Sequence, residues 1–214
     1  MEIKNIIFDF DGVILNSHRV KTSAFEDIFK KYGNSIAKKA KEYHLKHTGK
    51  SRYLKFHFIV RKILKQKTST DVINKLNNEF SKYCDAKILK LKVSKYLLKY
   101  LKKNYRDKNF FISTGTPQKN ILKLIKKIKI EKFFKSIHGS PSNKVDHINK
   151  ILSKYKNRSK TIFIGDSIID YNAAQKCGII FLLKLNSESK NLRFPKKVLK
   201  LKSFKYLDYN ISSL

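Results

Sequence analysis

The chain has 214 residues, and a chain of this length buries roughly 70% of its unfolded surface, so its fold requires neither disulfides nor a structural metal. Its formal charge of +33, from 49 Lys and Arg against 16 Asp and Glu, would attract nucleic acid, anionic lipid or anionic metabolites. Only six of the 49 are Arg, the lysines are spread along the whole chain and no nucleic-acid-binding motif accompanies them, which argues against specific nucleic-acid binding.

The N-terminal residues 1–13 contain one early lysine and a short apolar run that is cut by Asp9 and Asp11. This pattern predicts neither a signal peptide nor a transit peptide, and no apolar run reaches the roughly 18 residues of a membrane span. The two cysteines, Cys84 and Cys177, are too few and too scattered for a disulfide framework or a zinc site, which fits a reducing cytosol. We therefore expect a cytoplasmic protein without a membrane span.

Four short apolar runs, separated by lysine-rich helical patterns, predict strands of a parallel sheet joined by crossover helices. Asp9, Thr114 and Asp166 come just after three of these runs. Because ligands of open α/β sheets bind outside the carboxyl ends of the strands, we expect the chemistry of the protein at these three positions. The four runs are residues 3–8, 110–113, 161–164 and 179–183.

The stretch between the first two predicted strands carries apolar residues at helical spacing, for example Phe25, Ile28 and Phe29. Gly33 is expected to end one helix, and Ser69 lies among the N-cap residues that open another. The fold class is therefore predicted as α/β, with a Rossmann-like parallel sheet and an inserted all-helical unit. We expect residues 1–16 and 82–214 to form the core and residues 17–81 the insertion. The weakly patterned stretch from residue 187 onwards is assigned no role.

Asp9 and Asp11 follow the first strand and precede a glycine. Two carboxylates two residues apart on an extended segment leave the strand on the same side, and the glycine lets the backbone turn sharply. This arrangement suits phosphoryl transfer, because one carboxylate can attack phosphorus while the other gives a proton to the leaving oxygen and later takes one from water. An ordinary turn after a strand is the alternative, since Asp and Gly are common there.

Four motifs in the same order resemble those of the haloacid dehalogenase superfamily, and they span nearly the whole predicted core. The first has the form DxDGx, the second is a Ser or Thr after a hydrophobic strand, the third is a lysine ahead of a helix, and the fourth is GDSxxD. The matching stretches are FDFDGV at 8–13, FFISTGTP at 110–117, HGSPSNK at 138–144 and GDSIID at 165–170.

The resemblance implies a Mg²⁺ ion held by Asp9, the backbone carbonyl of Asp11 and Asp166, with Asp170 at or beside the metal. These are the oxygen ligands that Mg²⁺ prefers.

It also implies that Thr114 and the N–H of Gly115 bind phosphoryl oxygens and that Lys144 neutralises the charge that develops on them. Two alternatives remain open: Thr114 and Asp170 are also residue types that cap helices.

Asp11 separates the activities within the superfamily, because dehalogenases that resemble this fold lack the second aspartate. The expected activity is therefore a phosphatase that acts on a small phosphorylated metabolite, such as a sugar phosphate. A phosphomutase is the alternative, since it forms the same aspartyl phosphate, and a basic protein that binds anions or nucleic acid on the same fold is a more remote one. The oligomeric state and the substrate are not predicted.

The inserted unit resembles the helical cap of the phosphoglycolate phosphatase-like branch, in which a cap loop closes over the active site and contributes to substrate choice. The candidate loop is residues 48–56, where a glycine-containing turn precedes a helix with Arg52 and Lys55. These two cations lie three residues apart and are predicted to bind an anionic group of the substrate. The alternative is an interhelical turn with solvated charges.

Overall fold

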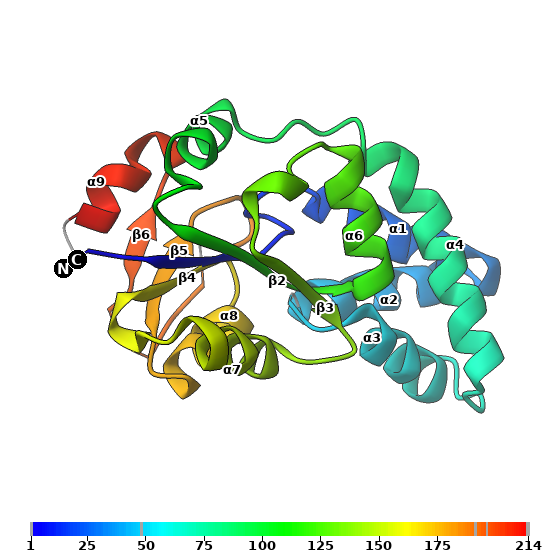
Figure 1. Ribbon diagram of the computed structural model, residues 1–214. Coiled ribbons are helices and arrows are strands. Elements are labelled where there is room, and N and C mark those ends of the chain that lie inside the picture. Colours follow the sequence, from blue (N-terminus) through cyan, green and yellow to red (C-terminus); the bar gives the residue numbers. More distant parts are fainter. Residues whose placement is uncertain (1, 48, 191, 196, 213–214) are drawn as a thin grey trace. The chain divides into compact units, whose positions relative to one another are not determined.

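The structure is a computed structural model that describes residues 2–47, 49–190, 192–195 and 197–212 (Figure 1). The chain divides into two compact units. The first unit comprises Met1–Asn16 and Lys92–Leu214, and the second comprises Ser17–Leu91. The second boundary therefore follows Leu91 rather than residue 81, because helix α4 (Thr70–Ile88) runs unbroken and its buried stripe continues through Cys84 and Ile88.

The first unit contains a six-stranded sheet in which every pairing is parallel, with the order β3-β2-β1-β4-β5-β6. The predicted α/β, Rossmann-like fold and its four predicted strands are confirmed, and two further strands, β3 and β6, were not predicted. Strand β3 has one aliphatic residue in SIHGS, and β6 has three residues, so neither carries a strand pattern. The strands are β1 (Asn5–Phe8), β2 (Asn109–Pro117), β3 (Ser136–Ser140), β4 (Thr161–Gly165), β5 (Ile180–Lys184) and β6 (Leu199–Leu201).

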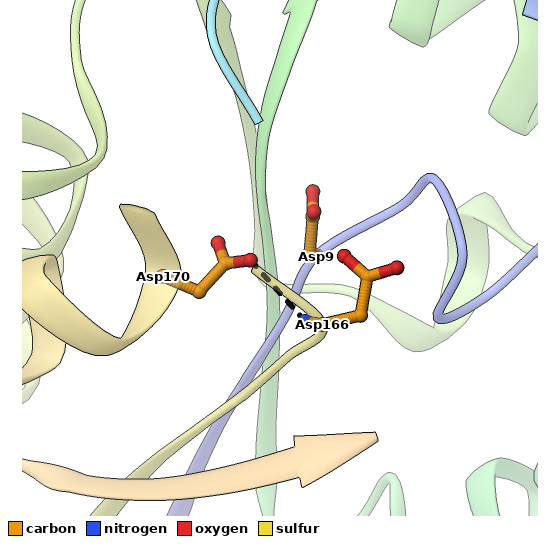
Figure 2. Close-up of side chains that lie close together, drawn as sticks. All are labelled: Asp9, Asp166 and Asp170. Carbon is orange, nitrogen blue, oxygen red and sulfur yellow. Dashed lines mark hydrogen bonds between the residues drawn. The ribbon is translucent and has the colours of Figure 1, made fainter. Parts of the chain in front are cut away.

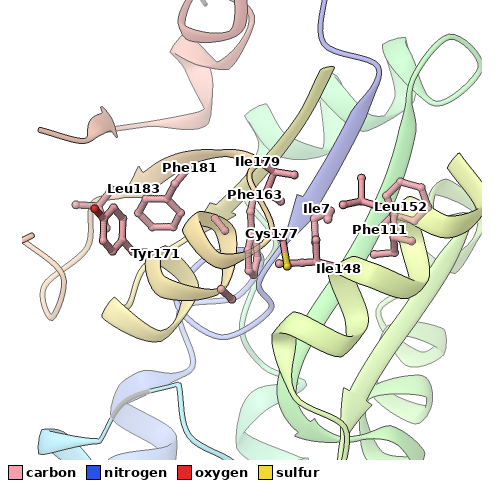
Figure 3. Packing of buried hydrophobic residues seen from close by; sticks show 13 residues of the cluster. Ile7, Phe111, Ile148, Leu152, Phe163, Tyr171, Cys177, Ile179, Phe181 and Leu183 are labelled. Carbon is pink, nitrogen blue, oxygen red and sulfur yellow. The ribbon is translucent and has the colours of Figure 1, made fainter. Parts of the chain in front are cut away.

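Helices cover both faces of this sheet (Figure 1). On one face, Ile7, Phe111 and Phe163 of neighbouring strands pack in a buried cluster with Ile148 of α7 and Tyr171 of α8 (Figure 3). The helices of the unit are α5 (Lys95–Asn104), α6 (Gln118–Lys127), α7 (Lys144–Tyr155), α8 (Ile168–Lys176) and α9 (Leu207–Ser212), with short 3₁₀ turns at Glu131–Phe133, Arg158–Lys160 and Phe204–Tyr206.

The opposite face of the sheet presents a second set of aromatic residues. Phe8 and Phe110 meet edge to face with ring centroids 5.9 Å apart, Tyr100 of α5 lies 5.9 Å from Phe110, and Phe204 lies 6.5 Å from Phe8. Phe204 belongs to the C-terminal stretch without a predicted role, which forms β6, a 3₁₀ turn and α9. Phe204 therefore adds to the apolar layer on this face, whereas Phe194 and Val198 of the same stretch pack against the cluster on the other face.

The second unit is all-helical, as the spacing of its apolar residues predicts. Phe25, Phe56 and Phe80 pack against one another with centroids 5.1 to 5.9 Å apart. Gly33, at φ 100°, lies between the first two helical segments, and the Ser69 side chain accepts a hydrogen bond from the backbone N–H of Val72 at the start of α4. The elements are α1 (His18–Phe29), a 3₁₀ turn (Lys30–Tyr32), α2 (Asn34–Lys46), α3 (Arg52–Phe58), a π-helical turn (Ile59–Ile63) and α4.

Among the described residues, no helix has both the length and the apolar character needed to cross a membrane.

Candidate active site

Strand pairing brings three of the predicted site residues to one edge of the sheet. Phe8 is in register with Ile112 of β2 and with Ile164 of β4, and the N–H of Asp9 donates to the carbonyl of Ile164 at 2.9 Å. Asp9 and Asp166 therefore come directly after the carboxyl ends of β1 and β4, and Thr114 lies on the neighbouring β2, two residues beyond the last residue that pairs with β1. Strand order reverses beside β1, which is where ligands bind in open α/β sheets.

Asp9, Asp166 and Asp170 form a buried carboxylate cluster (Figure 2). Each offers an oxygen that lies within 4.8 Å of an oxygen from each of the others. The Nζ of Lys144, also buried, lies 3.0 Å from Asp9 Oδ2 and forms an ion pair with Asp170 Oδ1. The Lys144 ammonium therefore pairs with two of the three carboxyl groups of the cluster.

Burial raises the pKa of the Asp9 carboxyl to about 8. Lys144 opposes this shift, whereas the negative charges of Asp170, Asp166 and Asp11 add to it. Burial alone would lower the pKa of the Lys144 ammonium, but Asp170 and Asp9 outweigh it and raise that pKa above its usual value. An additional cation beside Asp9 would therefore favour its ionised form.

Asp170 has a local structural role as well as its place in the cluster. Its Oδ2 accepts hydrogen bonds from the Ser167 hydroxyl at 2.6 Å and from the N–H groups of Ser167 and Asp166 at 3.0 and 3.2 Å. With Ser167 as N-cap, this is a capping box that opens α8. A Cβ at Gly165 would overlap the Asp170 side chain, which explains the glycine ahead of Asp166. Helix capping, one of the two alternatives for Asp170, is therefore present alongside its place among the carboxylates.

Asp11 lies in a tight turn after β1. Gly12 adopts φ 79°, and its N–H donates to the carbonyl of Leu15 at 2.7 Å. The Asp11 carboxylate accepts a hydrogen bond from the Thr116 hydroxyl at 3.0 Å. Asp11 is thus tied to the extended end of β2, and Thr116 is a residue of the site that sequence reasoning missed.

Thr114 and Gly115 lie within β2 rather than at the start of a helix, because the strand continues to Pro117. The helix N-cap alternative for Thr114 is therefore wrong. Its hydroxyl is buried and accepts a hydrogen bond from the N–H of Thr116 at 3.2 Å. No contact from Thr114 or Gly115 to the carboxylate cluster is observed among the described residues. Their assignment to the candidate site therefore depends on the pairing of β2 with β1.

Lys144 is the first residue of α7, directly after the N-cap Asn143, which forms a capping box with Asp146. One turn later, His147 Nδ1 lies 2.9 Å from the Ser113 hydroxyl and Nε2 lies 3.2 Å from the Gly139 carbonyl. Burial lowers the pKa of His147 to about 4, and its neighbour His138 adds to this effect. A neutral imidazole that donates from Nε2 and accepts at Nδ1 therefore fastens α7, and with it Lys144, to β2 and β3.

Arg52 and Lys55 belong to the helical unit, in α3, and both side chains are buried. Arg52 donates from Nη2 to Ser81 Oγ at 2.9 Å, and its guanidinium lies 5.1 Å from the centroid of the Phe80 ring. The Nζ of Lys55 lies 3.0 Å from His44 Nδ1. The alternative of solvated charges is therefore wrong for these two cations. Thr48, at the start of the candidate loop, lies outside the described residues.

The carboxylate cluster fits a divalent cation of the Mg²⁺ type. Its donors are hard oxygen atoms, and Mg²⁺ binds one or two carboxylates while it keeps several waters. Asp9 and Asp166 are the side chains best suited to hold it. Asp170 is less suited, because its Oδ2 already accepts three hydrogen bonds and its Oδ1 pairs with Lys144, whereas each Asp9 oxygen has one such contact.

The first unit is thus an α/β domain with a Rossmann-like sheet and a buried carboxylate cluster at the carboxyl ends of its central strands. The family model described as haloacid dehalogenase-like hydrolase matches residues 6–184, and the chain belongs to this family. A search of curated protein sequences gave no match.

Solved structures with the same fold have low sequence identity to the chain. A predicted phosphoglycolate phosphatase from Haemophilus somnus is 16% identical with a TM-score of 0.76, and the alignment covers 98% of both chains. CbbY from Rhodobacter sphaeroides in complex with xylulose-(1,5)bisphosphate is 15% identical with a TM-score of 0.75 and 96% coverage of both. The HAD-hydrolase YfnB from Bacillus subtilis, bound to magnesium, is 14% identical with a TM-score of 0.73 and 99% coverage of both.

Proposed function

We propose that the chain is a cytoplasmic, Mg²⁺-dependent phosphatase that hydrolyses a phosphate monoester of a small metabolite, with Asp9 as nucleophile and Asp11 as general acid and base. One observation carries the proposal. The buried Asp9 carboxylate, directly after β1, lies 3.0 Å from the Lys144 ammonium, and Asp11 follows two residues later with a hydrogen bond from Thr116.

The proposed reaction has two steps. In the first, an Asp9 carboxylate oxygen attacks phosphorus, the bond to the leaving oxygen breaks, and Asp11 donates a proton to that oxygen. In the second, Asp11 takes a proton from water, whose oxygen attacks the phosphorus of the aspartyl phosphate. Inorganic phosphate leaves and the Asp9 carboxylate is restored, so protons and phosphoryl groups balance over the cycle.

The other residues of the site stabilise charge on the transferring group. The Lys144 ammonium would contact phosphoryl oxygens as negative charge spreads over them, and the Thr114 hydroxyl and the Gly115 N–H would donate hydrogen bonds to them. Bound Mg²⁺ would screen the repulsion between the Asp9 carboxylate and the phosphate. Asp9, Asp166 and the carbonyl of Asp11 would hold the ion, with Asp170 beside it.

The helical unit is proposed to act as a cap that selects the substrate. Arg52 and Lys55 would bind an anionic group of the metabolite away from the reacting phosphate, through charge-assisted hydrogen bonds. A sugar phosphate is the favoured substrate class. This choice is supported by the sugar bisphosphate bound in the structure of CbbY. The description of the Haemophilus somnus protein as a predicted phosphoglycolate phosphatase supports only the broader class of small phosphorylated metabolites.

A screen of phosphate release tests the proposal, with sugar phosphates, phosphoglycolate and nucleotides as substrates. We expect release that requires Mg²⁺ and is lost with a chelator. Ca²⁺ should not replace Mg²⁺ in this reaction. The larger ion takes more ligands, so the nucleophilic carboxylate could bind Ca²⁺ through both oxygens. Asp9→Asn should abolish turnover, because an amide is a far poorer nucleophile and metal ligand.

Two results would contradict this assignment. Wild-type activity in Asp9→Asn would remove Asp9 from its role. Conversion of a sugar 1-phosphate to the 6-phosphate without release of phosphate would identify a phosphomutase instead.

A further inference from the structure

Asn186, two residues beyond β5, joins two parts of the carboxylate site. Its Nδ2 donates to Asp166 Oδ2 at 2.6 Å and to the backbone carbonyl of Gly12 at 3.2 Å. Asp166 follows β4, and Gly12 lies in the turn that carries Asp11. One amide group therefore bridges the ends of two strands, with one hydrogen bond to a carboxylate of the cluster and one to the turn after Asp9.

The conformation of Asn186 is fixed from the other side by its own loop. Its Oδ1 accepts hydrogen bonds from the N–H groups of Glu188 and Ser189, both at 2.8 Å. Its N–H donates to Ser189 Oγ at 2.8 Å, and the buried Ser189 hydroxyl donates to the Lys184 carbonyl at 2.8 Å. Because two N–H donors require an oxygen at Oδ1, the amide nitrogen must face Asp166.

An uncharged donor has a particular effect at this position. It fixes the orientation of the Asp166 carboxylate without neutralising its charge, whereas Lys144 contributes a full positive charge to Asp9 and Asp170. Partners that orient ligating carboxylates raise metal affinity, because the ligands no longer lose conformational freedom when the ion binds.

We propose that Asn186 is a positioning residue that sets the Mg²⁺ affinity of the site, by holding the Asp166 carboxylate and the Gly12 turn in the arrangement that receives the ion. This inference rests on the proposed function for the identity of the cation. None of the sequence motifs contains Asn186, so only the fold connects it with the site.

Two variants separate the contact with Asp166 from the order of the loop. In Asn186→Ser the short hydroxyl can still accept a backbone N–H in the turn, but it cannot reach Asp166. Ser189→Ala is the matched control, because it removes both hydrogen bonds of the Ser189 hydroxyl and leaves the Asn186 amide in place. Asn186→Thr offers the same hydroxyl in a second background, should the serine variant fold poorly.

The measurement is calorimetric titration of each metal-free protein with MgCl₂, alongside thermal unfolding without Mg²⁺. We expect Asn186→Ser and Asn186→Thr to weaken Mg²⁺ binding roughly 10- to 100-fold, and Ser189→Ala to bind close to wild type even where it unfolds earlier.

Unchanged affinity in the Asn186 variants, or an equal loss in Ser189→Ala, would overturn the inference while the proposed function stands. Absence of Mg²⁺ binding by the wild-type protein would instead overturn the metal assignment, and with it this inference.

Discussion

The two units of the chain bury charge of opposite sign. At the carboxyl edge of the sheet, Asp9, Asp166 and Asp170 are at most 5% exposed, with Lys144 among them. In the helical unit the buried charges are cations, with Arg52 9% and Lys55 3% exposed. Buried charge costs stability unless it is paired or hydrogen-bonded, and perturbed ionisable groups concentrate at functional sites. We propose that the first cluster is built for a cation and the second for an anion.

The two clusters are also held in different ways. The carboxylates accept hydrogen bonds from backbone N–H groups and hydroxyls, as in the capping box of Asp170 and Ser167. The cations lie against aromatic rings, with Lys55 Nζ 5.5 Å from the centroid of Phe25. Burial and the charge of Lys55 hold the pKa of His44 well below its usual value, so His44 is neutral and accepts the hydrogen bond from Lys55.

The largest expected effect among substitutions that keep the nucleophile comes from Asp11→Asn. The backbone carbonyl of residue 11, which is the proposed ligand, is unchanged, so Mg²⁺ binding should stay close to wild type. Proton transfer should be lost, which lowers kcat by roughly 10²–10⁴-fold. Steady-state kinetics with calorimetric Mg²⁺ titration checks both parts. A matching loss of Mg²⁺ affinity would show that the side chain serves the metal rather than the proton.

Removing the Lys144 ammonium from the carboxylate cluster tests the difference in charge between the two clusters. Lys144→Met should lower kcat by roughly 10²–10³-fold, because a charged donor to the transferring group is lost. Mg²⁺ should bind more tightly, since a competing positive charge beside Asp9 and Asp170 has gone. Weaker Mg²⁺ binding in a folded Lys144→Met protein would indicate that Lys144 organises the carboxylates rather than competing with the ion.

The helical unit should give the smallest effect, and it should depend on the substrate. Arg52→Ala should lower kcat/KM for the true substrate by about 10- to 150-fold, and p-nitrophenyl phosphate, which lacks a second anionic group, should be nearly unaffected. Ser81→Ala is the matched control, because it removes a hydrogen-bond partner of Arg52 and keeps the guanidinium. Equal losses with both substrates would place Arg52 in the fold or the core chemistry.

The sequence predicts the parts of the fold and site that depend on local pattern. Apolar runs that are followed by Asp9 and Asp166 predict the central strands. They also predict that the candidate site lies at the carboxyl ends of those strands. The third family motif identifies Lys144. Strand β3 escapes prediction because its alternation is weak, and its place beside β2 depends on long-range pairing. The boundary of the helical unit was misplaced because α4 has no break at residue 81.

Site residues without a motif could not be found in the same way. Thr116 and Asn186 join the site through hydrogen bonds to Asp11 and Asp166, across 105 and 20 residues of chain. Thr and Asn are common polar residues, and neither lies at a spacing that distinguishes it from a surface residue. Thr116 and Asn186 reach the site only because the strand order places the carboxyl ends of β2, β4 and β5 near the end of β1.

The most direct test of the account is the detection of a phosphorylated Asp9. The protein is mixed with Mg²⁺ and a phosphate monoester that it hydrolyses, and the reaction is quenched in acid. Reduction with borohydride then converts an aspartyl phosphate to homoserine. Peptide mass spectrometry then locates the modified residue. The account predicts homoserine at position 9, and none in Asp9→Asn or without substrate. Turnover with no modification, or with modification at another residue, would contradict the assignment of Asp9 as the nucleophile.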